Sequence, residues 1–208
     1  MGEEFTDETN YAHQALDELF AEHEERCPRY NLVLRWLRRL DAPPGRYEQQ
    51  HALYEIYCCH RTRSLADLAA EATRAHKRYR DRGLTEPQID PQLLAIANGV
   101  PVIFDATRDV SVLYGPKGHQ VIYLASHERP TDNNFDMLHE LAEWAIGDRE
   151  SHADVQVLTV LLAIEKPLVA AVLRAPNRQL ATLRLIEQHP HLPRWMPVLA
   201  VLLHGAFS

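Results

Sequence analysis

The chain has 208 residues, of which 46% are hydrophobic and 25% charged, values typical of an ordinary globular protein. A net charge of −7 gives no overall positive field for nucleic acid or anionic lipid, so neither direct nucleic-acid binding nor membrane binding is expected. The sequence shows no bilayer-length apolar run, no signal-peptide pattern and no cysteine framework, which predicts a cytoplasmic protein with reduced thiols. Twelve histidines are the unusual count, because histidine often ligates metals or moves protons near neutral pH.

The first 60 residues show helical periodicity. Apolar residues recur at helical spacing over 11–20 and 32–40, and a third helix is predicted over 47–59. This segment contains twelve acidic and six basic residues, whereas 61–82 contains three acidic and seven basic. Because the charge balance reverses between residues 60 and 61, we predict an N-terminal helical module over 1–60 and a second domain over 61–208.

The middle of the chain changes from helix to strand. A capped helix is predicted over 65–82, and a short helix follows over 91–98. Three β-rich runs come next, at 100–104, 110–114 and 119–124, with a four-residue hairpin loop before the last. We expect these runs to form a small meander-like sheet.

Helical periodicity returns after the sheet. An amphipathic helix over 132–145 is closed by Gly147, and a second helix is predicted from Glu150 to Pro167, followed by two or three more. The predicted fold class is therefore α+β, mostly helical, with a small three-stranded sheet packed against the helix over 132–145.

That helix carries the sequence His139-Glu140-Leu141-Ala142-Glu143. Residues four apart share one helix face, so the His139 imidazole and the Glu143 carboxylate can reach one ion, with Glu140 beside them. The pattern is that of the H-E-x-x-H metalloprotease helix with its second histidine replaced by glutamate. The antiparallel helix that follows can return a third ligand to the same face.

Residues 65 to 167 resemble the ImmA/IrrE family of metallopeptidases. The resemblance rests on the Ile89-Asp90-Pro91 segment, on the helix around His139 and on the His152-Ala153-Asp154 segment with the apolar helix after it. It implies the fold of that family, an H-E-x-x-H helix followed by a helix whose first turn supplies the third zinc ligand.

The resemblance also implies roles for individual residues. His139 matches the first histidine ligand and Glu140 the catalytic glutamate, while Glu143 and His152 occupy the positions of the second histidine and the distal glutamate. Histidine and glutamate have thus exchanged places, leaving two histidines and one carboxylate, a set that zinc accepts with a fourth position open. Because the turn between the two helices is tight, Glu150 and Asp154 remain alternative third ligands.

Metal-assisted peptide hydrolysis is the reaction that this family resemblance implies, with zinc activating a water molecule and Glu140 taking its proton. An extended substrate is expected beside an edge of the sheet, where the strand over 119–124 would pair with it. Four side chains are candidate oxyanion donors: Tyr114, His119, Tyr123 and His127.

Two functions follow as expectations. The first is a zinc-dependent intracellular endopeptidase of the ImmA/IrrE type that cleaves a regulatory protein such as a helix-turn-helix repressor, in stress response or transcription regulation. The alternative is a non-catalytic relative that has lost its metal, in which His139 and Glu143 form only a helical ion pair. In that case the acidic helices over 1–60 would be the contact surface for a protein partner.

Overall fold

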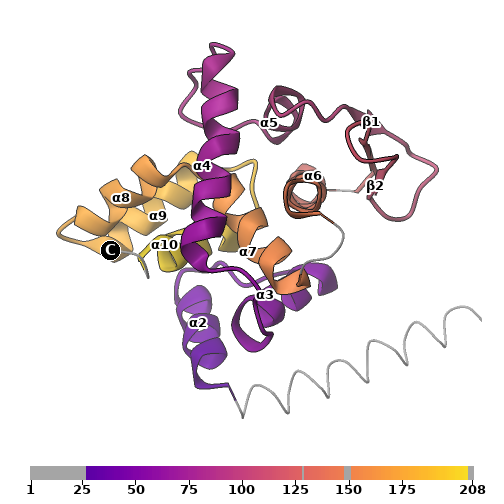
Figure 1. Cartoon of the computed structure of the whole chain (residues 1–208). Coiled ribbons are helices and arrows are strands. Elements are labelled where there is room, and N and C mark those ends of the chain that lie inside the picture. Colours follow the sequence, from indigo (N-terminus) through magenta and orange to yellow (C-terminus); the bar gives the residue numbers. More distant parts are fainter. Residues whose placement is uncertain (1–26, 128, 148–150, 206–208) are drawn as a thin grey trace, which may run out of the picture.

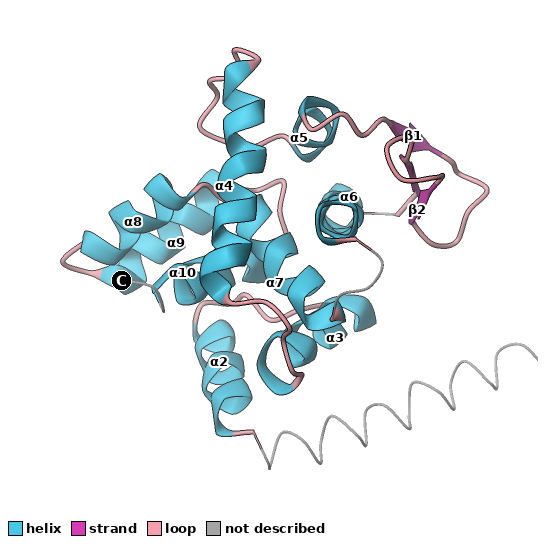
Figure 2. Cartoon of the chain, viewed as in Figure 1, coloured by secondary structure: helices cyan, strands magenta, loops and turns pink. Residues whose placement is uncertain are grey.

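A computed structural model describes residues 27–127, 129–147 and 151–205. Its elements in chain order are α2 (Pro28–Arg39), α3 (Tyr47–Cys58), α4 (Leu65–Asp81), α5 (Pro91–Ala97), β1 (Val102–Phe104), β2 (Val112–Tyr114), β3 (Val121–Leu124), α6 (Pro130–Ile146), α7 (His152–Ala163), α8 (Lys166–Arg174), α9 (Arg178–Gln188) and α10 (Trp195–Gly205). Most described residues are helical and the three strands form one small sheet, so the α+β prediction is confirmed (Figure 2). The helix predicted over 11–20 lies outside the described residues.

Local sequence signals account for several helix ends. The Ser64 hydroxyl caps α4 by accepting a hydrogen bond from the Asp67 amide at 3.1 Å, as expected for a serine N-cap. Gly147 ends α6 with a φ of +88°, a conformation that glycine adopts without the steric cost of a Cβ. This glycine turns the chain from α6 toward α7.

The helix predicted to reach Pro167 is wrong at its C-terminal end. Helix α7 ends at Ala163, Ile164 is extended, and α8 begins at Lys166 with Pro167 in its first turn. Proline has the φ angle of a helix and needs no partner for a missing N–H at that position. Pro167 therefore opens a helix instead of closing one.

The expected meander and the expected edge position of the last strand are also wrong. The strand order is β1-β3-β2, with β1 parallel to β3 and β2 antiparallel to it. Ile122 and Leu124 of β3 are fully buried, whereas Ile103 and Phe104 of β1 are exposed. The most buried strand therefore takes the centre, and β2 is an edge strand among the described residues.

Helix α7 lies at the centre of the helical body. Every residue from Ala153 to Ala163 is buried, and α3, α4, α6 and α10 pack around this helix (Figure 1). Helix α6 lies between α7 and the sheet, as Figure 1 shows with α6 viewed end-on. One hydrophobic cluster extends from Tyr30 in α2 to Leu203 in α10, so α2 and α3 share the core of the remaining helices.

Within the described residues, no single helix has both the length and the hydropathy needed to cross a membrane. Helices α7 and α8 reach that length only as a pair, and the pair is bent by 78°.

Candidate metal centre

The ends of α6 and α7 that carry the predicted motif are fixed by the connection between α3 and α4. The carboxylate of Asp154, in the first turn of α7, accepts hydrogen bonds from the backbone amides of Thr62 and Arg63 at 3.0 and 3.2 Å. The Arg63 guanidinium donates in turn to the Ile146 carbonyl at 3.3 Å, at the last turn of α6. One short loop therefore holds both helix ends in place.

Asp154 is thus placed as a structural anchor. Its side chain is completely buried, and the Thr62 hydroxyl donates to it at 2.5 Å in addition to the two backbone amides. A carboxylate that already accepts these hydrogen bonds has its oxygens occupied away from His139. Glu150, the other alternative third ligand, lies outside the described residues.

Three predicted ligands meet at the junction of α6 and α7. The Oε1 atom of Glu143 lies 3.4 Å from Nε2 of His139 and 3.7 Å from Nε2 of His152. The two imidazole rings are 5.3 Å apart, centroid to centroid. Two ring nitrogens and one carboxylate oxygen therefore converge, and they satisfy the spacing for a metal-ligand group.

These separations suit zinc. Zinc binds nitrogen and oxygen ligands at about 2.0–2.2 Å, so the ligand atoms of a tetrahedral site lie about 3.3–3.6 Å from one another. The distances from Glu143 to His139 and His152 are close to that range, without a rearrangement of the helices. The donor set of two imidazoles and one carboxylate is also one that zinc accepts.

Charges in the cluster are strongly coupled. The neighbouring imidazoles of His139 and His152 lower the pKa of Glu143 to about 2. Glu143 first, and Glu55 second, raise the pKa of His152 to about 10. Without a metal, the cluster is therefore an ion pair in which His152 is a cation.

Glu140 has a different environment from Glu143, although both are on α6. Its side chain is buried, and this desolvation raises the pKa of Glu140 to about 7, with a further contribution from the charge of Glu143. A hydrogen bond with the backbone of Leu113 in β2 opposes the increase. Glu140 is thus poised to exchange a proton near neutral pH.

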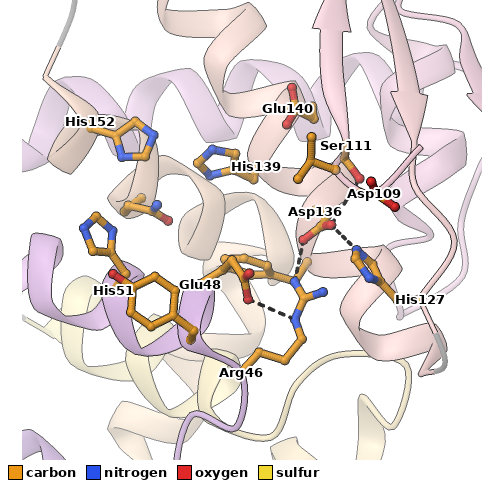
Figure 3. Close-up of a pocket in the computed structure, with 14 residues that line it drawn as sticks. Arg46, Glu48, His51, Asp109, Ser111, His127, Asp136, His139, Glu140 and His152 are labelled. Carbon is orange, nitrogen blue, oxygen red and sulfur yellow. Dashed lines mark hydrogen bonds and ion pairs between the residues drawn. The ribbon is translucent and has the colours of Figure 1, made fainter. Parts of the chain in front are cut away.

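A cavity of about 290 Å³ opens beside this cluster. His139, Glu140 and His152 line it together with apolar groups that include Val110 and Phe135. Figure 3 shows the two imidazoles on one side of the cavity and Glu140 on the side of the strands. The cavity therefore gives a ligand access to the predicted base and to two of the predicted metal ligands.

The wall opposite His152 is a polar network centred on Asp136, one turn before Glu140. The Asp136 carboxylate lies 2.8 Å from the Arg46 guanidinium and 2.5 Å from Nε2 of His127, and it accepts a hydrogen bond from the Ser111 hydroxyl at 3.1 Å (Figure 3). This network connects α6 to α3 and to the segment before β2.

Of the four candidate oxyanion donors, only His127 lines the cavity. Tyr114 is 67% exposed and packs edge-on against Tyr123, whose ring is covered by the Arg108 guanidinium. His119 is exposed on the hairpin loop. Tyr114 and Tyr123 share one face of the sheet, opposite to the buried side chains of Ile122 and Leu124, because side chains alternate along a strand.

Two residues of α3 join the cluster without having been predicted. Both carboxylate oxygens of Glu55 lie 2.8–2.9 Å from Nδ1 of His152, and Nδ1 of His51 lies 3.4 Å from Glu55. Although burial opposes it, His152 and His51 lower the pKa of Glu55 to about 2. These three residues form a second group with metal-ligand spacing that shares His152 with the first. The i, i+4 spacing of His51 and Glu55 is the signal in the sequence that was available.

Comparisons with family models, with curated proteins and with solved structures find no significant match for this chain.

Proposed function

We propose that the protein is a zinc-dependent endopeptidase of the ImmA/IrrE type. The observation that carries this proposal is the convergence of His139, Glu143 and His152 at the spacing of zinc ligands, directly beside Glu140 and an open cavity. His139 and His152 would each bind zinc through Nε2 and Glu143 through a carboxylate oxygen. Zinc in such a site supplies Lewis-acid activation of a water molecule and of the scissile carbonyl.

Glu140 would act as the general base. A catalytic base works best when its pKa is close to the working pH, and burial gives Glu140 a pKa of about 7. Its carboxylate faces the cavity on the side of β2, where it can take a proton from water and return it to the leaving amine. The neighbouring Glu143 is unsuited to this role because its pKa is about 2.

The substrate would be an extended peptide segment. Among the described strands, β2 is an edge strand, and its Leu113 backbone contacts Glu140. A peptide that adds to this edge would pass the base and the metal ligands. By the resemblance of the chain to ImmA/IrrE peptidases, we propose that this segment belongs to a regulatory protein such as a helix-turn-helix repressor, within the cytoplasm, in stress response or transcription regulation.

The substitution Glu140→Gln tests this function. Zinc-loaded wild-type protein and the variant are incubated with a quenched-fluorescence peptide library, and bound zinc is measured on the same samples. We expect cleavage by the wild type and a loss of about 10²–10⁴-fold in the variant with zinc retained, the usual contribution of a general base. Equal cleavage by both proteins would remove Glu140 from the mechanism, and no cleavage by zinc-loaded wild type would contradict the peptidase function.

One observation favours the alternative of a non-catalytic binding protein. His152 lies between the carboxylates of Glu55 and Glu143, so its positive charge is paired without a metal. A cluster of this kind can hold α3, α6 and α7 together as a purely structural ion-pair network. Zinc binding by the wild type distinguishes the two functions, because the alternative predicts none.

A further inference from the structure

The Glu55 carboxylate contacts one predicted zinc ligand from outside the predicted ligand set. Glu55 is on α3, far in sequence from the motif, and its side chain is buried. Its two oxygens lie 2.9 and 2.8 Å from Nδ1 of His152, which are the distances of a charge-assisted hydrogen bond. His51, one turn earlier on the same helix, also contacts Glu55, with its Nδ1 3.4 Å from Oε2.

The two nitrogens of His152 therefore have separate partners. Nδ1 donates to Glu55, whereas Nε2 is directed toward Glu143 at 3.7 Å. Histidine ligands of metals commonly donate their second ring N–H to a carboxylate, which fixes the tautomer and the orientation of the ring. The arrangement around His152 matches this pattern before any metal is considered.

His152 needs such a partner more than His139 does. The His152 side chain is 49% exposed at the start of α7, so the protein surface leaves its ring free on one side. The His139 side chain is only 16% exposed and stacks on Phe135 at 6.2 Å, and its buried Nδ1 has no hydrogen-bond partner among the described residues. Packing orients the His139 ring, and the hydrogen bond to Glu55 orients the His152 ring.

The same contact argues against a second metal ion between His51, Glu55 and His152, although these residues have metal-ligand spacing. Separations of 2.8–2.9 Å are shorter than the ligand-to-ligand distances of about 3.3–3.6 Å in a tetrahedral zinc site. A second ion would also need His152 to lose both ring protons and to bridge two metals. A hydrogen bond between Nδ1 of His152 and the Glu55 carboxylate accounts for these distances without a second metal ion.

We propose that Glu55 is the positioning residue of the metal centre, holding His152 in the tautomer and orientation in which Nε2 binds zinc. This inference rests on the proposed zinc site and adds α3 to it. The carboxylate also increases the basicity of the imidazole that it holds. Metal affinity is therefore set by a helix that contributes no metal ligand.

The experiment compares zinc affinity in the wild type, Glu55→Ala, Glu55→Gln and Glu48→Gln. Glu48 is an exposed carboxylate on the same helix, so Glu48→Gln matches the charge change of Glu55→Gln without touching His152. We expect zinc affinity to fall about 10–100-fold in Glu55→Ala, the usual effect of removing such a partner. The loss should be smaller in Glu55→Gln, because the amide oxygen still accepts the Nδ1 hydrogen bond, and Glu48→Gln should bind zinc like the wild type.

Two further measurements separate positioning from general damage to the fold. Thermal unfolding of the metal-free proteins shows whether each variant folds, and ¹⁵N NMR of the histidine rings shows the His152 tautomer in the zinc-bound state. We expect one tautomer, protonated at Nδ1, in the wild type and a mixture in Glu55→Ala.

Three outcomes would overturn the inference. Wild-type zinc affinity in folded Glu55→Ala removes the role of Glu55 while leaving the zinc site intact. Two zinc ions per wild-type chain, with one lost in His51→Ala, assign Glu55 to a second metal site instead. A wild type that binds no zinc removes the proposed function together with the positioning role.

Discussion

The imidazole rings of His139 and His152 lie 5.3 Å apart, with an angle of 70° between their planes, although one is on α6 and the other begins α7. The Glu143 carboxylate is within 3.7 Å of both rings. This relationship depends on the turn at Gly147 and on the loop that anchors Asp154, because together they return the chain to the same side of α6.

Glu140 predicts the pH dependence of cleavage. A general base acts in its deprotonated form, and burial raises the pKa of Glu140 to about 7. A bound cation lowers the pKa of a nearby carboxyl, so kcat/KM should rise with pH through an apparent pKa at or below about 7 and level off above it. A pH profile with the peptide library measures this. A profile that still rises steeply above pH 8 would assign the base to another group.

We expect a substitution of Asp154 to destabilise the fold but to leave zinc binding intact. Asp154→Asn keeps the size of the side chain but removes its charge and places an amide donor against the donors of Thr62 and Arg63. We expect the free energy of unfolding to fall by about 1–3 kcal/mol, measured by urea denaturation. Under native conditions the folded variant should still bind one zinc. Loss of zinc from folded Asp154→Asn would identify Asp154 as a ligand instead of an anchor.

We expect His204 in α10 to make the stability of the fold sensitive to acid, away from the metal centre. Burial first, and the charges of Lys166 and His76 after it, lower the pKa of His204 to about 4. Because this value is below the 6.5 of the unfolded chain, the unfolded state binds the proton first and stability falls as the pH decreases from about 6.5 toward 4.

The variant His204→Asn cannot be protonated in this range. Urea denaturation at pH 7 and pH 5 should therefore show a smaller loss of stability in the variant than in the wild type. Burial also lowers the pKa of His76, so part of the pH dependence should persist. Identical pH dependence in both proteins would show that His204 does not contribute.

The site residues that are close together in the sequence could be predicted, whereas the contact with a residue far away in the sequence could not. His139 and Glu143 are one helical turn apart, so their common face follows from helix geometry alone, and Glu140 is the residue next to His139. His152 could be placed because it lies only nine positions after Glu143, at the start of the next predicted helix. Glu55 was missed because its contact with His152 joins residues 97 positions apart and depends on how α3 packs against α7.

The pairing of the strands shows the same limit of prediction from sequence. The β2–β3 hairpin has a local signal in its glycine-containing loop, and the structure contains that antiparallel pair. The parallel pairing of β1 with β3 has no local signal, since it depends on which strand is buried most deeply. That pairing placed β3 at the centre of the sheet, whereas Tyr114 and Tyr123 lie away from the cavity because side chains alternate along β2 and β3.

The amount of bound metal shows directly whether His139, Glu143 and His152 form a zinc site. Wild-type protein, His139→Ala, His152→Ala and the control His119→Ala, which changes an exposed histidine of the hairpin, are equilibrated with zinc, dialysed and analysed for bound metal and thermal stability. We predict one zinc per chain in the wild type and the control, with about 2.7 kcal/mol of stabilisation at a zinc concentration 100-fold above Kd, and loss of both in the two site variants. A wild-type protein that holds no zinc, and whose unfolding temperature zinc does not raise, would contradict the account.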